Sequence, residues 1–211
     1  MIMETLSIKK YISRKGDNMN TIDMRFDNSL IQGWIGKAFE KYKCDQFDFT
    51  NSVTQIVGLF IDNNVYTMTN IQETVDYFGN TDDIAVCRIS ESTEEDIKSA
   101  LKDSKMIFTP VNGTISKIRL VNENQQIFES GDVSYDVWIT RAIIFFVDGR
   151  EISFEKDNIP FSEEIIIRKG YDLYKKCSDE NAFLEGWDEG IIAKCTRHIV
   201  DITSDAIVID S

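Results

Sequence analysis

The sequence has 211 residues, of which 42% are hydrophobic and 28% charged, and its formal net charge is −13. A chain of this length buries roughly 70% of its extended surface, and its composition excludes collagen-like and intrinsically disordered proteins. No apolar run approaches the roughly 20 residues of a membrane-spanning helix, and the N-terminal segment lacks the apolar stretch of a secretion signal. We therefore expect a globular, cytoplasmic protein that does not bind membranes.

The first strong helical pattern lies near the N-terminus. Four apolar residues recur at four-residue spacing, which predicts an amphipathic helix over residues 29–43 with Asp27 or Asn28 as its N-cap. These residues are Leu30, Trp34, Ala38 and Tyr42.

Strand and helix signals alternate over the next sixty residues. Residues 54–70 have the pattern of a β-hairpin that turns at Asn63-Asn64, and residues 82–90 have that of a strand. Asn70 and Glu73 resemble a capping box and predict a short helix that ends at Gly79. A further helix is predicted to begin at Ser92 and to bury three apolar side chains, namely Ile97, Ala100 and Leu101.

From Met106 onward the chain is a series of strand-like runs separated by short turns, which indicate antiparallel neighbours. Asp148-Gly149 favours a type I′ turn, because both central residues need positive φ. This turn pairs Val147 with Arg150, and it places Phe145 opposite Ile152. The second strand of this hairpin, residues 150–156, is apolar on one face only. We therefore expect it near an edge of the sheet.

The end of the chain is expected to add a helix and a strand. Residues 171–187 have a helical pattern after the break at Gly170, and residues 190–202 read as a closing strand. These signals together predict an α+β fold with a mixed N-terminal half (residues 1–105) that carries amphipathic helices and short hairpins. Residues 106–211 form an antiparallel β-meander with a covering helix, and the two halves are either separate domains or one continuous domain.

Sequence motifs exclude several chemistries. The stretch around Gly33, Gly36 and Lys37 lacks the length and the hydroxyl of a P-loop, and no dinucleotide-binding glycine motif is present. One histidine and four well-separated cysteines favour reduced, mostly buried thiols over a zinc site. Glu155 and Lys156 are adjacent, so they point to opposite faces of a strand and do not form a nuclease-type metal site. We expect no metal, no cofactor and no catalytic residue, although a spatially assembled carboxylate pair stays open.

The acidic residues are concentrated in the middle of the chain. Residues 44–103 contain twelve acidic and three basic residues. A field of this sign repels phosphate backbones and attracts basic surfaces, so direct nucleic-acid binding is not expected. The residues expected to bind a basic partner are Asp82, Asp83, Glu91, Glu94, Glu95 and Asp96.

The run YDVWITRAIIFFVDGREISFEKDNIPFSEEIIIRKGYDL, residues 135–173, resembles accessory proteins of uncharacterised function that are carried by phages and mobile elements of low-GC bacteria. The resemblance implies a context, because small acidic proteins of such elements often bind and block a host or defence protein. It implies no active-site residues.

Two functions remain in competition. The leading hypothesis is a non-enzymatic acidic protein that engages a basic, nucleic-acid-handling protein, for instance as an anti-defence inhibitor. The alternative is a small-ligand-binding protein or a hydrolase whose carboxylate site is assembled only in space. A deep polar pocket that includes Arg141 or Arg168 would favour the alternative, whereas a convex acidic face would favour the leading hypothesis.

Overall fold

The computed structural model describes residues 20–47, 50–77, 80–129, 131–185, 187–204 and 206–210. Over these residues the protein is mostly antiparallel β-sheet, so the predicted α+β class is wrong. The strands are β1 (Asn20–Met24), β2 (Ala38–Asp45), β3 (Ser52–Thr54), β4 (Ile56–Ile61), β5 (Asn64–Tyr77), β6 (Asn80–Ser92), β7 (Met106–Glu129), β8 (Asp132–Val147), β9 (Arg150–Lys156), β10 (Glu164–Gly170), β11 (Ile191–Ile202) and β12 (Ile207–Asp210). The helices are α1 (Asn28–Gln32) and the 3-10 turns η1 (Glu94–Asp96), η2 (Leu173–Lys176) and η3 (Glu180–Leu184).

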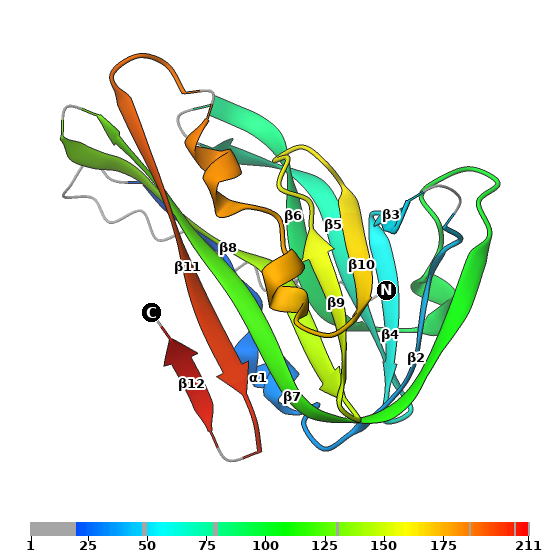
Figure 1. Ribbon diagram of the computed structural model, residues 1–211. Coiled ribbons are helices and arrows are strands. Elements are labelled where there is room, and N and C mark those ends of the chain that lie inside the picture. The colour runs from blue at the N-terminus through cyan, green and yellow to red at the C-terminus, as the bar shows by residue number, and fades with distance from the viewer. Residues whose placement is uncertain are drawn as a thin grey trace, which may run out of the picture.

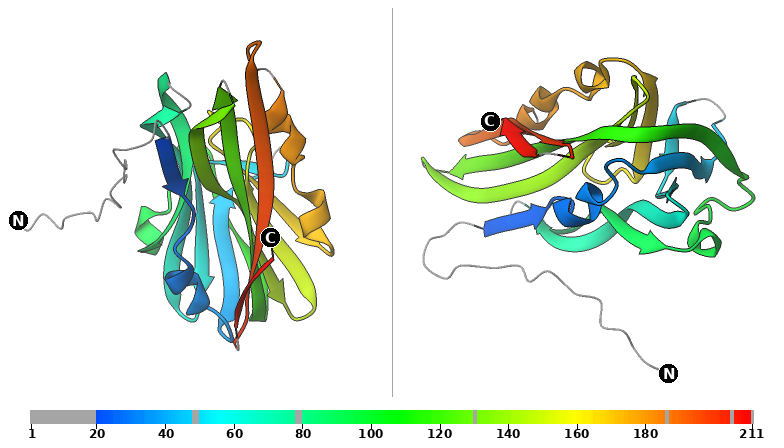
Figure 2. Two further views of the ribbon diagram at one scale, coloured as in Figure 1. Left: turned by 90° about the vertical axis from the view of Figure 1, so that its left-hand side faces the viewer. Right: turned by 90° about the horizontal axis from the view of Figure 1, so that it is seen from below.

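The strands form one sheet that folds back on itself (Figure 1). Its order is β3-β10-β9-β8-β7-β2-β4-β5-β6, while β1 pairs in parallel with β8, and β11 and β12 extend from β7. Seen from below, the sheet forms two layers, with β8, β9 and β11 in one and β4, β5 and β6 in the other (Figure 2). The strand β7 belongs to both layers, because its first part pairs with β2 and its second part with β8 and β11.

The bend in β7 lies at Asn112 and Gly113. The register between β2 and β7 shifts here, and Asn112 adopts a positive φ of 53°, as in a β-bulge that sharpens the twist of a strand. A Cβ on Gly113 would lie 2.4 Å from Cγ1 of Val147. The absence of a side chain at residue 113 therefore lets the turn after β8 approach the bend closely.

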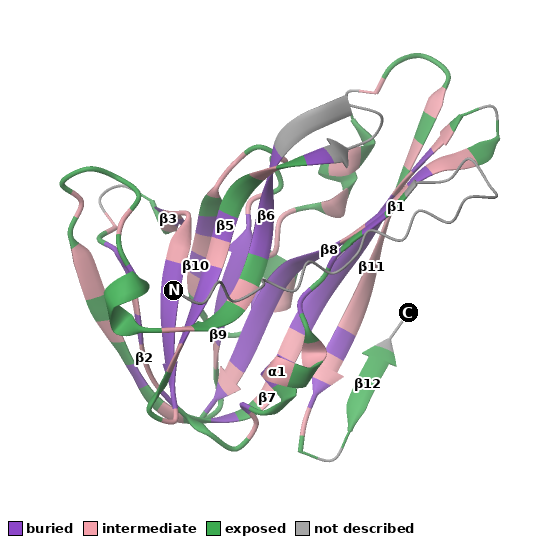
Figure 3. Cartoon of the chain, turned by 180° about the vertical axis from the view of Figure 1, so that it is seen from behind, coloured by how far each residue is buried: buried purple, intermediate pink, exposed green. Residues whose placement is uncertain are grey.

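The main hydrophobic core fills the closed end of this folded sheet. Its largest buried side chains are aromatic, and they come from both layers: Trp34, Phe39, Tyr42, Phe145 and Phe154. Figure 3 shows the buried residues along the facing strands and the exposed strand β12 at the outside.

The Asp148-Gly149 hairpin has the predicted structure. Both turn residues have positive φ, and the register places Val147 opposite Arg150 and Phe145 opposite Ile152. However, β9 is not an edge strand, because β10 pairs with it along its other side. The segment of η2 and η3 covers the polar face of β9. The polar side chains of β9 therefore do not mark an edge of the sheet, contrary to the prediction from the sequence pattern.

The predicted helix over residues 29–43 is wrong beyond its first turn. Asp27 does cap α1, since its side chain accepts a hydrogen bond from the backbone N–H of Ser29 at 2.9 Å. The helix ends at Gly33, Gly36 takes a φ of +80°, and the chain continues as β2. Tyr42 is buried as expected, but from a strand.

The other predicted helices are also corrected. β5 continues as a strand through Tyr77, and buried Asn70 donates from Nδ2 to the carbonyl oxygens of Ser162 and Glu164 instead of capping a helix; Gly79 lies outside the described residues. Only the turn η1 follows Ser92, and it buries Ile97 but leaves Leu101 exposed. The predicted helix over residues 171–187 is two 3-10 turns. The hairpin of β4 and β5 is confirmed, but its turn lies at Asp62-Asn63 and not at Asn63-Asn64. The strands β6 and β11 are confirmed, although β12 follows β11.

The division at residue 105 stays a prediction. β7 begins directly after it and pairs with β2 from the first half and with β8 from the second.

Candidate functional site

A cavity lies where β8 changes its neighbour. β9 pairs with residues 142–147 of β8, while β1 pairs with residues 135–139. Thr140 and Arg141 therefore lie between these two partners on the edge of β8. A cavity of about 210 Å³ is lined here by β6, β8, the end of β9 and η3. This volume is below the range of drug-sized ligand sites, roughly 300–1,000 Å³, so the cavity suits only a small molecule.

Arg141 is placed by a β-bulge. The register between β7 and β8 steps from Val121–Ala142 to Asn122–Thr140, so Arg141 is the extra residue of β8 in this ladder. Bulges of this kind redirect side chains and are frequent beside functional sites. Here the bulge turns a guanidinium into the protein at 4% exposure.

Glu123 lies beneath the cavity between two arginines. Its Oε2 accepts a hydrogen bond from Nη2 of Arg141 at 2.7 Å, and its Oε1 accepts one from Nη2 of Arg197 at 2.9 Å. Burial alone would raise the pKa of Glu123, but the two guanidiniums outweigh burial and lower it below its ordinary value. Glu123 is therefore a buried carboxylate anion at neutral pH.

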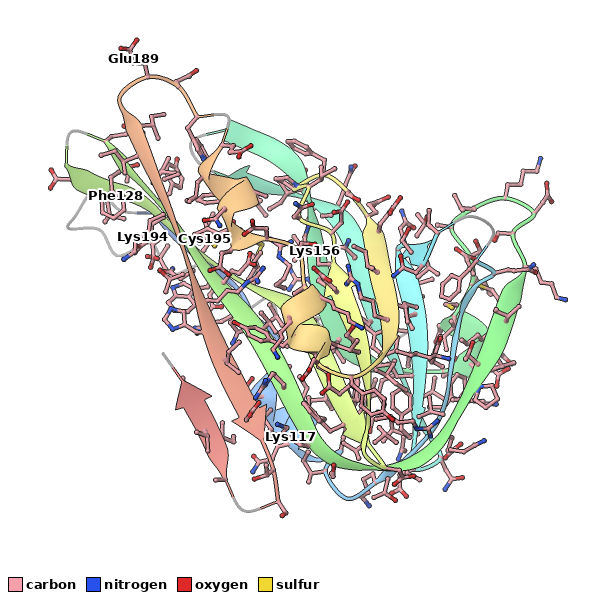
Figure 4. All side chains as sticks on the ribbon, viewed as in Figure 1. Lys117, Phe128, Lys156, Glu189, Lys194 and Cys195 are labelled. Atoms are coloured by element: carbon pink, nitrogen blue, oxygen red, sulfur yellow. The ribbon has the colours of Figure 1, made fainter. Side chains whose placement is uncertain are left out.

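Lys156 supplies a third cation, and no carboxylate of the described residues lies within ion-pair distance of its ammonium. It is 6% exposed, and its Nζ donates to the backbone carbonyls of Asp157 at 3.3 Å and Ile159 at 3.5 Å. Burial, followed by the positive charge of Arg141, lowers the pKa of Lys156 to about 8. Figure 4 shows Lys156 in the interior of the molecule beside the short helical turns, and Glu189 at the outer tip of the β11 loop.

The prediction that Glu155 and Lys156 point to opposite faces is confirmed. Glu155 accepts hydrogen bonds from Arg168 and from the backbone N–H of Ser178, on the side covered by η2. Lys156 instead lines the cavity.

The loop after β9 closes one side of the cavity. Its Pro160 carbonyl accepts a hydrogen bond from the backbone N–H of Ala85 in β6 at 2.9 Å. This contact ties the loop that carries the acceptors of Lys156 to the opposite layer of the sheet. The wall around Lys156 is therefore held by both layers.

The rim of the cavity is acidic and aromatic, whereas its interior carries cations. η3 and its flanks bring Asp179 and Glu185, which are exposed, and Glu180, which is 3.0 Å from Nε of Arg197. Phe183 and Trp187 pack edge to face with centroids 5.3 Å apart. The cavity thus has cationic side chains in its interior, aromatic side chains along one side (the aromatic wall, Phe183 and Trp187) and acidic side chains at its rim.

The cysteines are not activated. Burial raises the pKa of Cys87, which lines the cavity, and that of Cys195 to about 12. Both thiols are protonated at neutral pH, whereas a nucleophilic cysteine needs a lowered pKa. His198 packs against Trp138 with ring centroids 4.9 Å apart.

The acidic residues selected from the sequence do not form one site. Glu91, Glu94, Glu95 and Asp96 lie at the end of β6 and in η1, where all four are exposed. The side chains of Asp82 and Asp83 lie outside the described residues, and their backbone is near the start of β6. At ~3.3 Å per strand residue, Asp83 and Glu91 are roughly 26 Å apart along the strand.

Two of the exposed acids already have local contacts. Asp96 accepts a hydrogen bond from the hydroxyl of Thr93 at 2.6 Å, which closes the turn of η1. Oε1 of Glu94 lies 3.9 Å from Nζ of Lys43. The interaction of these residues with a basic partner stays a prediction.

Sequence reasoning named Arg141 as a marker of a polar cleft but missed Glu123, Lys156 and Arg197. One signal was present, since residues 122–125 are four consecutive polar residues inside a strand. All four are buried, and a buried polar run in a strand is unusual unless it is hydrogen-bonded.

Comparison with known proteins gives no relatives. No protein-family model matches the chain, and neither a curated protein nor a solved structure is significantly similar to it. Within the described residues, no helix is both long enough and apolar enough to cross a membrane.

Proposed function

We propose that the protein binds a small organic anion in the cavity beside Lys156. The observation that carries this proposal is the buried Lys156 ammonium, which has only two backbone carbonyl acceptors among the described residues. An ammonium has three N–H donors, so one donor remains for a ligand. A carboxylate or phosphate oxygen at this position would form a charge-assisted hydrogen bond.

The charge balance of the interior supports the same ligand class. Arg141 and Arg197 share the buried carboxylate of Glu123, Arg197 also contacts the partly exposed Glu180, and the ammonium of Lys156 lines the same cavity as Glu123 and Arg141. Buried charges are costly unless they are paired. An anionic ligand would compensate an excess of positive charge that occurs inside a protein with a net charge of −13.

The aromatic wall indicates what else the ligand carries. Phe183 and Trp187 line the cavity together with apolar residues of β6, so a flat or apolar body next to the anionic group would be buried against them. Phenyl phosphate and benzoate combine these two features and are suitable probes, with acetate and inorganic phosphate as the matching anions without a ring.

The test is titration calorimetry of the four anions against the full chain and two variants. We expect the aromatic anions to bind more tightly than acetate and phosphate, and Lys156→Met to weaken binding at least tenfold. Lys175→Met is the matched control, because the side chain of Lys175 is 76% exposed and does not line the cavity. Equal affinities for all three proteins, or no binding of any anion, would overturn the proposal.

A further inference from the structure

We infer that Lys156 is a nucleophilic amine that captures a small aldehyde or ketone as an imine within this cavity. The inference rests on the proposed ligand site and adds a covalent activity to it. In this step the Nζ lone pair forms a C–N bond to the carbonyl carbon as the C=O π bond breaks. The nitrogen gives up its two protons, the oxygen takes up two protons and leaves as water, and a C=N bond remains.

The hydrogen bonds of Lys156 suit the neutral amine. An uncharged NH₂ group has two N–H donors, and the structure supplies two acceptors, the carbonyls of Asp157 and Ile159. With both hydrogens engaged, the lone pair takes the remaining position of the nitrogen. No protein donor to Nζ is present among the described residues, so the lone pair is available to a carbonyl carbon in the cavity.

The surroundings make this neutral form accessible near neutral pH, while the ammonium still predominates at pH 7. Lysine amines become nucleophiles when they are desolvated or lie beside another cation, and both conditions hold for Lys156. It is 6% exposed, and Arg141 donates from Nη1 to the backbone carbonyl of Lys156 itself at 3.2 Å. The pKa of about 8 has the same two causes.

The nearby charges define the carbonyl compound. When Lys156 becomes a neutral imine, the guanidinium of Arg141 still lines the cavity, and it shares the carboxylate of Glu123 with Arg197. A substrate that carries its own carboxylate or phosphate beside the carbonyl would therefore be favoured over a neutral aldehyde. Glyoxylate is the smallest compound with both groups.

The experiment treats the full chain with glyoxylate and cyanoborohydride, which reduces any imine to a stable secondary amine. Intact mass and peptide mapping then report which lysines are modified. We expect Lys156 to be modified at least tenfold faster than exposed Lys175, and phenyl phosphate to slow the modification of Lys156 only. Modification of Lys156 at the same rate as Lys175 would overturn the inference.

Lys156→Arg separates the inference from the proposed function. Arginine keeps the buried cation but is not an amine nucleophile, so this variant should bind phenyl phosphate and lose the fast modification. If the wild type binds phenyl phosphate but shows no preferential modification, the imine inference fails and anion binding stands. If Lys156 is modified rapidly while no anion binds, the proposed function fails and the reactive amine stands.

Discussion

The two ends of the space enclosed by the sheet are built on opposite principles. At the closed end, the ring of Phe145 lies 4.9 Å from that of Phe39 and 6.0 Å from that of Trp34, measured between centroids. At the open end, Glu123 and Arg141 form a buried ion pair beside a cavity. Apolar burial at the closed end stabilises the fold, whereas desolvation of the charged groups at the open end is unfavourable for folding.

A single strand contributes to both ends. Phe145 and Arg141 are four residues apart in β8, and Arg141 is the bulged residue. Natural proteins keep costly buried charges chiefly where function uses them. The contrast is the reason for placing the proposed ligand site at the open end, with the closed end as its scaffold.

The largest expected effect is at the closed end. Phe145→Ala should lower the free energy of unfolding by about 4 kcal/mol, because truncation of a buried aromatic ring leaves a cavity. Denaturant titration measures this effect, and Phe108→Ala is the control, since Phe108 is 44% exposed. Equal losses in the two variants would remove the distinction between core and surface on which the comparison rests.

A smaller loss is expected from Glu123→Gln, about 3 kcal/mol, because it removes the buried carboxylate that the guanidiniums of Arg141 and Arg197 share. The pKa of Glu123 is below its ordinary value in the folded state. Its stabilising contribution is therefore fully present above the ordinary value of 4.5 and is lost as the pH falls through the folded pKa. Unfolding curves at several acidic pH values should show a shallower acid loss for Glu123→Gln than for the wild type.

Lys156→Met should change stability in the opposite direction. The shift of the lysine pKa from 10.5 to about 8 means that the charged form is disfavoured in the folded state. The variant should therefore be more stable at pH 7 by about 2 kcal/mol, somewhat less than the shift alone implies, because Met leaves the two carbonyl acceptors without a donor.

The pH dependence sharpens this prediction. Between pH 8 and 10.5 the unfolded chain binds more protons at Lys156 than the folded protein does, so wild-type stability should rise with pH in this range. The difference between wild type and Lys156→Met should shrink across the same range. A difference that is constant with pH would show that charge is not the cause.

The smallest effect on stability is expected at the acidic surface. Reversal of Glu91 and Glu95 to lysine should shift the melting temperature by less than about 2 °C, because both residues are exposed. If a basic partner protein is captured, the double variant should associate more slowly and with a weaker dependence on salt. An unchanged association rate would mean that these residues do not guide a partner.

Local sequence signals determined the parts of the fold that depend on neighbouring residues. The Asp148-Gly149 turn and the register of its two strands follow from positive φ at two adjacent positions and from alternation, and both are as predicted. The cap at Asp27 is equally local.

The wrong helix predictions have a common cause. Spacings that fit a helix, such as that of Trp34 and Tyr42, also fit separate elements divided by Gly36, and Asn70 can bond distant carbonyls as well as cap a helix. Tertiary pairing chose between these alternatives, because strand ladders satisfy every backbone group over long distances, while a short helix satisfies few.

The sequence by itself thus determined the hairpin of β8 and β9, the acidic balance and the opposite directions of Glu155 and Lys156. Only the tertiary structure decided that β9 is an interior strand and that Glu123, Arg141, Lys156 and Arg197 converge. Their charges lie on β7, β8, β9 and β11, up to 74 residues apart. No local sequence pattern encodes the convergence of these four side chains. It depends on one extra residue in β8 and on the change of the pairing partner of β8 from β9 to β1.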